Sequence, residues 1–161
     1  INSCIDLTLL HTTAKKLPNV SFVLIGPLTG LSAADLKKTS NIHYLGIKAN
    51  EELHHYLRAF DIAMLPYQYT ANSENCLVPQ IFEYMNADKP IIATKYDESL
   101  DNYSICITMI KDAKEFTEAI TFLMDKTDRL SMELAYYKIL KKKSWDGIAD
   151  KMKSILKSYA K

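Results

Sequence analysis

Glycine is scarce in this sequence, with only 4 residues among 161, and the scarcity excludes two common nucleotide sites. Neither G-x-G-x-x-G nor G-x-x-x-x-G-K-[ST] occurs, so the glycine turn of dinucleotide-binding folds and the P-loop are both missing. D-x-D is also missing, and the nearest group of acids, Asp97, Glu98 and Asp101, falls in a segment that we expect to be a loop. We therefore expect no standard NAD or ATP site, and any chemistry on a diphosphate would have to be metal-free.

Cysteine and histidine give no sign of a metal or a disulfide. Cys4, Cys76 and Cys106 are odd in number and form no C-x-x-C pair, so neither a disulfide framework nor a zinc knuckle is indicated. His54 and His55 are adjacent, and neighbouring side chains on a helix point apart. No G-x-S-x-G motif marks a nucleophilic serine. We expect no metal and no cofactor.

An excess of one charge and long apolar runs are missing too. Lys and Arg number 20 against 19 Asp and Glu, so the net charge of +1 gives no field that would attract nucleic acid or an anionic membrane. The apolar runs reach about four to six residues, far below the roughly 18 that span a bilayer, and no signal segment opens the chain. We expect one compact, soluble, cytoplasmic domain. Because it begins at Ile1 without a methionine, we also expect a piece of a longer protein.

Short apolar runs recur at a nearly fixed interval. They read FVLI at 22–25, IHYL at 42–45, IAML at 62–65 and PIIAT at 90–94, and SICITMI at 104–110 favours a further strand nearer an edge. Continuous aliphatic runs are typical of strands buried on both faces, which predicts a parallel sheet. Helical patterns lie between and after the runs, at 50–59 with Asn50 as N-cap, at 112–126, and in the tail at Ile148, Met152, Ile155, Leu156 and Tyr159. The sequence predicts an α/β fold, a Rossmann-like parallel sheet with helices on both faces.

The strand ends give this sheet a direction. The first three runs end on Gly26 and Pro27, on Gly46, and on Pro66. In a parallel sheet these ends share one edge, and ligands bind outside the carboxyl ends of such strands. We expect any site to lie among residues 26–29, 46–48, 66–77 and 94–98.

The segment from Pro79 to Thr94, PQIFEYMNADKPIIAT, is the best candidate for part of that site. A helix opened by Pro79 would point its free amides toward the strand ends, which suits a phosphate. Glu83 would lie one turn further in, where its carboxylate can accept two hydrogen bonds from a vicinal diol such as a ribose. On these residues alone, a solvated or capping acid is the favoured interpretation of Glu83.

At these residues the chain resembles the C-terminal, donor-binding half of a GT-B fold glycosyltransferase, close to glycosyltransferase family 4 and the group 1 transferases of polysaccharide synthesis. The resemblance lies in four blocks in order: LPNVSFVLIGP at 17–27, NIHYLGIKANEELHHYLRAFDIAMLPY at 41–67, FEYMNADKPIIAT at 82–94 and KKSWDGIADKMKSIL at 142–156. It implies metal-independent transfer of a sugar from a UDP- or GDP-linked donor to an acceptor hydroxyl, with retention as the family's habit.

The resemblance also implies roles for single residues. Glu83 matches the second glutamate of an E-x7-E element, which binds the donor ribose. Gly46, Ile47 and Lys48 match the segment that contacts the base, and Gly26 and Pro27 the loop beside it. The donor sugar and diphosphate would lie at Glu74, Asn75, Cys76, Leu77, Val78, Pro79 and Gln80.

Three departures from the family pattern fall beside Glu83. Asn75 stands at the position of the first glutamate of E-x7-E, with Glu74 one place away. Gln80 stands where a P-x-K-x-x-E variant has lysine, and Asp88 replaces the usual glycine before Lys89 and Pro90.

The family domain also opens with a strand, a glycine turn and a basic pair, whereas this chain begins in what we expect to be the first helix. In a sheet of order 3-2-1-4-5-6 that strand is central, so we expect a gap in the core and an acceptor-binding N-terminal domain outside residues 1–161.

Two other functions stay open at this point. A nucleotide-sugar 2-epimerase would share the fold, but would need acid and base residues in the cleft. A non-catalytic nucleotide-binding α/β module would need neither; a receiver domain would need an acidic pair after its first strand, which is missing here. A saccharide or lipid-linked saccharide acceptor would bring the whole protein to the inner membrane face as a peripheral contact.

Overall fold

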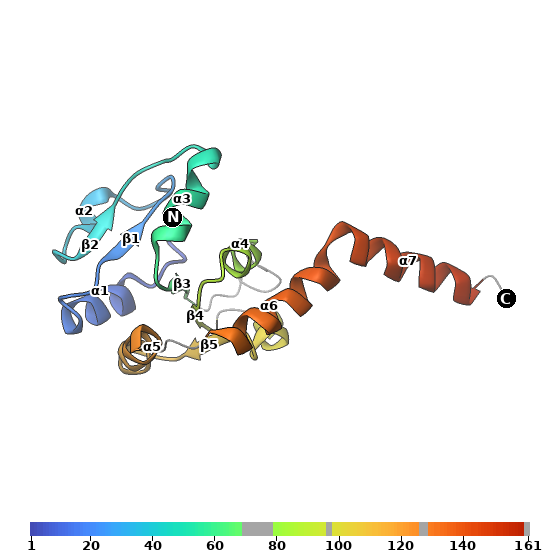
Figure 1. Cartoon of the computed structure of the whole chain (residues 1–161). Helices are drawn as coiled ribbons and strands as arrows, with labels where there is room; N and C mark the ends of the chain where they lie inside the picture. Colours follow the sequence, from blue (N-terminus) through green and yellow to red (C-terminus); the bar gives the residue numbers. More distant parts are fainter. Residues whose placement is uncertain (69–78, 96–97, 126–128, 160–161) are drawn as a thin grey trace.

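The computed structural model describes residues 1–68, 79–95, 98–125 and 129–159 (Figure 1). Its strands are β1 (Phe22–Leu24), β2 (Ile42–Tyr44), β3 (Ala63–Leu65), β4 (Ile91–Thr94) and β5 (Ile107–Ile110). Its helices are α1 (Leu7–Lys16), α2 (Ala33–Leu36), α3 (Asn50–Ala59), α4 (Gln80–Asn86), α5 (Ala113–Asp125), α6 (Leu130–Lys143) and α7 (Trp145–Tyr159), with a 3-10 helix, η1 (Glu98–Tyr103).

All the strand pairs are parallel, as the continuous apolar runs predict. β1 pairs with β2, and β3, β4 and β5 form a second sheet in that order. Each predicted run contains its strand, although only the last residues of the 104–110 run are extended. β5 lies at an edge, as expected. The α/β fold prediction is confirmed, with the sheet divided in two.

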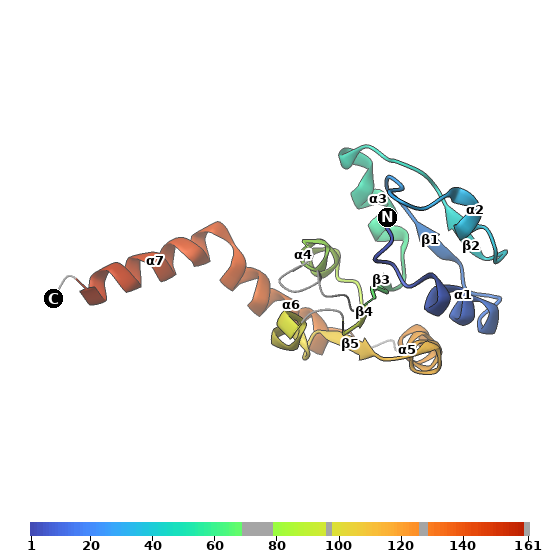
Figure 2. The same ribbon diagram turned by 180° about the vertical axis from the view of Figure 1, so that it is seen from behind.

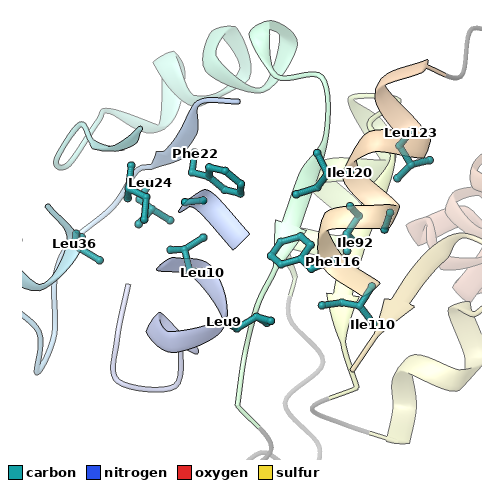
Figure 3. Close-up of a cluster of buried hydrophobic side chains, with 13 residues drawn as sticks. Leu9, Leu10, Phe22, Leu24, Leu36, Ile92, Ile110, Phe116, Ile120 and Leu123 are labelled. Carbon is teal, nitrogen blue, oxygen red and sulfur yellow. The ribbon is translucent and has the colours of Figure 1, made fainter. Parts of the chain in front are cut away.

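Helices α1 and α5 pack against each other and cover one face of both sheets (Figures 1 and 2). Beneath them lies a cluster of buried side chains in which Leu10 and Phe22 lie on the opposite side from Phe116 and Ile120 (Figure 3). Helices α4 and α6 pack together over the other face of the three-stranded sheet, around the fully buried Tyr136. The Tyr136 hydroxyl donates to the carbonyl oxygens of Lys89, at 2.9 Å, and Cys106, at 3.2 Å.

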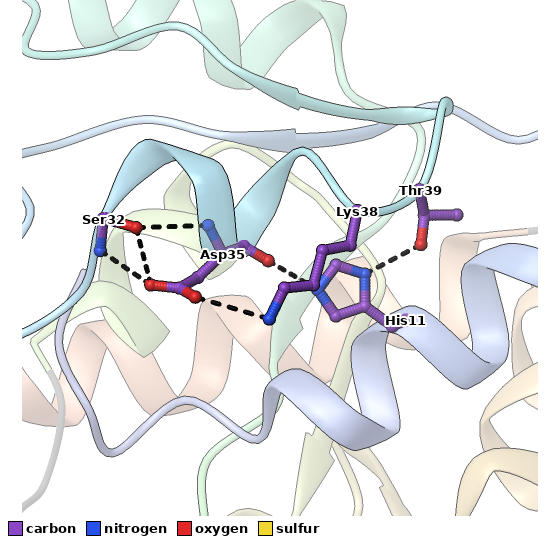
Figure 4. Close-up of polar contacts among 5 residues, drawn as sticks. All are labelled: His11, Ser32, Asp35, Lys38 and Thr39. Atoms are coloured by element: carbon purple, nitrogen blue, oxygen red, sulfur yellow. Dashed lines mark hydrogen bonds and ion pairs between the residues drawn. The ribbon is translucent and has the colours of Figure 1, made fainter.

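Polar side chains fix the loops around α1. The side-chain amide of Asn41 donates to the carbonyl oxygens of Leu17 and Val20, each at 2.8 Å, and so holds the turn before β1. His11 joins α1 to α2 and to the segment that follows α2: its Nε2–H donates to the Asp35 carbonyl at 2.8 Å, and the Thr39 hydroxyl lies 2.8 Å from Nδ1 (Figure 4). These contacts place β1 and β2 beside α1.

Two local expectations need correction. Asn50 is the first residue of α3 rather than its N-cap, because the extended residue before it is Ala49, whose N–H donates to Glu52 at 3.3 Å. The tail does form a helix, but the apolar face of α7 is exposed, not packed. Figures 1 and 2 show α7 leading away from the sheets from the end of α6, with which it is in contact. In the described ranges, no helix has both the length and the apolarity needed to cross a membrane.

The space between β1 and β3 holds a large cavity of about 560 Å³. β1 and β3 both line it and do not pair with each other. Its walls include Phe22 and Leu24 of β1, Ala63 and Met64 of β3, and Phe116 and Ile120 of α5.

Residues 1–6, which we call the bridging stretch, cross the cavity at the carboxyl edge of the sheets. The Thr29 N–H donates to the Ile1 carbonyl at 2.9 Å, beyond the end of β1. On the other side, the Gln68 N–H donates to the Cys4 carbonyl and the Asp6 N–H donates to the Pro66 carbonyl, each at 2.7 Å. The bridging stretch forms only isolated bridges, so it is not a central strand.

Candidate functional site

The loops after β1 and β2 are joined at the carboxyl edge of the sheet. The Gly26 N–H donates to the Gly46 carbonyl at 2.9 Å, and the Tyr44 hydroxyl donates to the Gly26 carbonyl at 2.9 Å. Gly26 has φ +134° and Gly46 has φ +74°, backbone conformations that residues with a Cβ rarely adopt. The loop predicted to contact a nucleotide base and the loop predicted to lie beside it therefore meet, and both glycines are half-buried.

Lys48 and Ile47 follow this junction. The Lys48 ammonium lies 5.6 Å from the centroid of the Tyr56 ring, where the negative face of the ring attracts it. Ile47 is 72% exposed, so its side chain does not belong to the core. Pro27, on the other side of the junction, accepts a hydrogen bond from the amino terminus of Ile1 at 2.8 Å.

Helix α4 begins where the sequence predicts it. Pro79 occupies the N-cap position, Gln80 is the first helical residue, and Glu83 lies in the first turn. Glu83 is exposed and, within the described residues, α4 has no side-chain cap. The capping interpretation of Glu83 is thus unsupported, and its carboxylate is accessible to a ligand.

One cavity connects these elements. Gln80 and Glu83 of α4 line the 560 Å³ cavity together with Ile25, which follows β1, and Tyr56 of α3. Gly26, Pro27, Gly46, Ile47 and Lys48 are beside this lining rather than part of it. The structure thus brings Glu83 and Gln80 to the same opening as the ring under Lys48. The remaining candidates, Glu74, Asn75, Cys76, Leu77 and Val78, lie outside the described residues.

Sequence reasoning missed two tyrosines at this opening. Tyr67 and Tyr84 line the cavity near Glu83. Burial, and to a smaller extent the charges of Tyr67 and Glu83, raise the pKa of the Tyr84 hydroxyl above its ordinary value, so it stays protonated at neutral pH. Thr94 fixes the approach to the site, since its hydroxyl donates to the carbonyls of Leu65 and Tyr67. Tyr67 directly follows the proline that ends β3, a position that could have singled it out.

The titratable groups described elsewhere do not form a second centre. No group of three or more His, Cys, Asp or Glu residues within the described ranges could hold a metal ion. No histidine is among the residues that line the cavity. The exposed Lys95, which directly follows β4, forms an ion pair with Asp101 at 2.8 Å, where solvent screens it.

A family model and a curated protein both match this chain in sequence. Residues 7–126 match the family model described as "Glycosyl transferases group 1". A protein of Bacillus subtilis (strain 168), TuaH, named as a candidate glycosyltransferase of teichuronic acid biosynthesis, is 25% identical over 93 residues, which are 56% of this chain and 23% of TuaH.

Solved structures share the fold at low sequence identity. Anabaena HepE, solved in complex with UDP and glucose, has a TM-score of 0.66 and 15% identity, covering 95% of this chain and 44% of HepE. WaaG, a glycosyltransferase of lipopolysaccharide biosynthesis, has a TM-score of 0.52 and 17% identity, covering 82% of this chain and 36% of WaaG. The chain therefore spans less than half the length of these proteins. The family match extends over most of its residues, and the chain belongs to the group 1 glycosyl transferases.

Proposed function

We propose that this chain is the donor-binding domain of a glycosyltransferase that moves a sugar from a nucleoside diphosphate to an acceptor hydroxyl. The observation that carries the proposal is the position of Glu83, an accessible carboxylate in the first turn of α4 that lines the cavity together with Pro66 and Tyr67, just past the carboxyl end of β3. Ligands of open α/β sheets bind at this edge. Family membership makes a glycosyl donor the natural ligand.

Glu83 has the chemistry of a ribose anchor. A carboxylate accepts hydrogen bonds only, and its two oxygens match the two hydroxyls of a vicinal diol. Such charge-assisted bonds contribute about 1.5–3 kcal/mol each. Tyr84, held protonated beside it, offers a hydroxyl donor on the same wall of the cavity. The anchor therefore binds the sugar of the nucleotide without contacting the base.

The base and the diphosphate would lie on either side of this anchor. The base would lie against the loops that meet at Gly26 and Gly46, with Lys48 above the Tyr56 ring beside them. The diphosphate would reach Gln80 and the segment that precedes α4. HepE, which shares the fold, was solved with UDP and glucose. We favour a UDP-linked donor, with a GDP-linked donor as the second choice.

Transfer would proceed without a metal. No D-x-D pair occurs in the sequence to hold a metal on the diphosphate. The developing charge on the leaving group would instead be stabilised by fixed donors and basic side chains of the whole protein. EDTA should leave the turnover of the full-length protein unchanged, and a requirement for added Mg²⁺ or Mn²⁺ would contradict this part of the proposal.

The acceptor would be a saccharide or a lipid-linked saccharide bound by the rest of a longer protein, with the product entering a cell-surface polysaccharide such as a capsule. The name given to TuaH supports this direction. A lipid-linked acceptor would place the enzyme at the cytoplasmic face of the membrane as a peripheral protein. An isomerase of the same fold is disfavoured, since no histidine lines the described cavity to move a proton.

The experiment is a titration of the full-length protein with UDP, 2′-deoxy-UDP, GDP and ADP by calorimetry. Glu83→Ala should weaken UDP binding by about 150-fold or more, the loss of two charge-assisted hydrogen bonds of about 1.5 kcal/mol or more each. It should weaken 2′-deoxy-UDP binding less, by about 10- to 150-fold, because only the bond from the 3′-hydroxyl is then lost. Glu51→Ala is the matched control, an exposed glutamate in the first turn of α3 outside the cavity lining.

Two results would count against the proposal. Equal losses for UDP and its 2′-deoxy form would show that Glu83 does not bind the ribose 2′-hydroxyl. Failure of every nucleotide to bind the unmodified full-length protein would remove the donor-binding function itself. The melting temperature of Glu83→Ala should match that of the unmodified protein within experimental scatter, because no hydrogen bond from this side chain stabilises the described fold.

A further inference from the structure

We propose that Tyr67 is a specificity-determining residue for the ribose of the donor, and that Thr94 is the residue that positions it. This role rests on the proposed function and adds to it the group that would read the ribose hydroxyls together with Glu83. Two observations carry it. They are the hydrogen bonds of the Thr94 hydroxyl, and the place of Tyr67 on the wall of the cavity that Glu83 and Tyr84 also line.

Thr94 holds the chain at the point where the pairing of β3 with β4 stops. The register of these strands ends with Leu65 opposite Ala93. The next residue, Pro66, has no backbone N–H to donate. The Thr94 hydroxyl lies 2.5 Å from the carbonyl oxygen of Tyr67 and 3.3 Å from that of Leu65, so its hydrogen is directed mainly to Tyr67. A side chain of β4 therefore fixes the backbone of Tyr67 beyond the end of β3.

The residues on either side of Tyr67 are held by the bridging stretch. The carbonyl of Pro66 accepts a hydrogen bond from it and the N–H of Gln68 donates one to it, each at 2.7 Å. Three consecutive residues are thus anchored, and the backbone conformation limits the rotamers that the half-buried Tyr67 side chain can adopt. A side chain that is ordered before the ligand arrives costs less entropy on binding.

Tyr67 and Tyr84 belong to the same part of the wall. Both are half-buried and pack against the cluster that surrounds Tyr136. Burial raises the pKa of the Tyr84 hydroxyl above its ordinary value, and the charges of Tyr67 and Glu83 raise it further. Tyr84 is therefore within electrostatic reach of both groups. Two phenols and one carboxylate come together at this opening.

These groups match the chemistry of a sugar hydroxyl. Such a hydroxyl donates one hydrogen bond and also accepts, whereas a carboxylate only accepts and a phenol can donate. Glu83 would take the hydrogen of a ribose hydroxyl while Tyr67 donates to its oxygen. A site built to bond a substrate hydroxyl discriminates strongly against an analogue that lacks it. The ligand class is therefore a nucleoside diphosphate with free ribose hydroxyls.

The test is calorimetric titration of the full-length protein with UDP and with 2′,3′-dideoxy-UDP. Tyr67→Phe removes only the hydroxyl and should weaken UDP binding about 3- to 10-fold. It should leave 2′,3′-dideoxy-UDP binding within about twofold, since that ligand has no hydroxyl to read. Thr94→Val, which has nearly the same shape but no hydroxyl, should give the same pattern. Thr94→Ser keeps the hydroxyl and should bind UDP as the unmodified protein does.

The double variant shows whether Thr94 acts through Tyr67. Thr94→Val combined with Tyr67→Phe should weaken UDP binding by the same 3- to 10-fold or so, rather than by the product of the two single losses. Thr117→Val is the matched control, because Thr117 is also half-buried and its hydroxyl donates to the Ala113 carbonyl at 2.6 Å, outside the cavity lining. Its UDP affinity should not change.

A milder substitution covers the case in which Thr94→Val does not fold well enough for titration. Thr94→Cys keeps a weaker donor at the same place and should give a smaller loss in the same direction, again for UDP and not for 2′,3′-dideoxy-UDP. Unchanged UDP affinity in Thr94→Cys and Tyr67→Phe together would overturn the proposal as firmly as the same result for Thr94→Val.

The outcomes separate this role from the proposed function. A full-length protein that binds no nucleotide would contradict both. A strong loss for Glu83→Ala with unchanged UDP affinity for Tyr67→Phe would overturn the role of Tyr67 alone. Equal losses of UDP and 2′,3′-dideoxy-UDP in Thr94→Val would show that Thr94 supports the fold and not the reading of the ribose. Losses that multiply in the double variant would show that Thr94 does not act through Tyr67.

Discussion

Replacing Asp88 with glycine should stabilise the protein. Asp88 has φ +52° and is the only non-glycine residue with positive φ in the described ranges. It ends α4 in a Schellman motif, since its N–H donates to the Met85 carbonyl at 3.1 Å and the Lys89 N–H donates to the Tyr84 carbonyl at 3.0 Å. A residue with a Cβ is strained in this backbone conformation, and glycine is not.

The size of the gain follows from two opposing effects. A left-handed conformation costs an ordinary L-residue about 1–2 kcal/mol, and less for aspartate, which tolerates it better than most. Glycine relieves that cost but gives the unfolded chain more freedom, which offsets about 0.5–1 kcal/mol. Removing a negative charge from the C-terminal end of a helix adds a few tenths of a kcal/mol. We expect a net gain of about 0.5–1 kcal/mol, or roughly 1–4 °C in melting temperature for a chain of this size.

The assay is thermal unfolding followed by far-UV circular dichroism. Ala87→Gly is the matched control: it makes the same kind of change one residue earlier, where φ is −90°, and should lower stability by about 0.4–1 kcal/mol. Asp88→Asn removes the charge and keeps the left-handed residue, so it separates the two contributions. A melting temperature of Asp88→Gly at or below that of the unmodified protein would refute the reasoning.

Two further predictions use hydroxyls in opposite situations. Tyr136→Phe should lower stability by about 1–3 kcal/mol, since it leaves two buried carbonyls without the donor that Tyr136 now supplies; an unchanged urea midpoint would contradict this. Thr13→Val should instead raise stability by about 1 kcal/mol, because the fully buried Thr13 hydroxyl has no hydrogen-bond partner in the described part of the chain and valine has nearly the same shape. A lower urea midpoint for Thr13→Val would indicate that this hydroxyl does have a partner.

The strands were the most predictable part of the fold. Strands covered on both faces must be apolar at every position, so runs such as those that contain Phe22, Ala63 and Ile92 are visible in the sequence without an alignment. Helix α5 was predicted for a related reason, because Phe116, Ile120 and Leu123 repeat at helical spacing and are all buried. The short helix α2 went unpredicted, since its four residues contribute only Leu36 to the core.

The apolar face of α7 shows the limit of periodicity. The spacing of Ile148, Met152 and Ile155 predicts a helix correctly, but it says nothing about what the face packs against, and here all three are exposed. Local pattern fixes the conformation of a segment, whereas burial depends on which other segments are present to cover it.

The candidate site was predictable in part. The helix start at Pro79 and the position of Glu83 in the first turn follow from local rules that the sequence displays. The ribose role of Glu83 stays a prediction. Tyr84 and the contact of Lys48 with Tyr56 were not predicted, because both depend on how α3 and α4 lie around the cavity, which no sequence spacing encodes. The sequence shows the start of α4 with Glu83 and the segment with Lys48 as separate features, and the structure shows that Glu83 and the Tyr56 ring beneath Lys48 line the same cavity.

The position of Trp145 determines what fluorescence can report about this protein. It is the single tryptophan of the chain, and it lies at the start of α7 with 87% of its surface exposed. Tryptophan emission will therefore hardly change when the sheets unfold, and a fluorescence melt would wrongly suggest that no cooperative transition occurs. The same isolation makes Trp145 a clean probe of α7: a blue shift of its emission would report anything that covers this helix, with no background from the core.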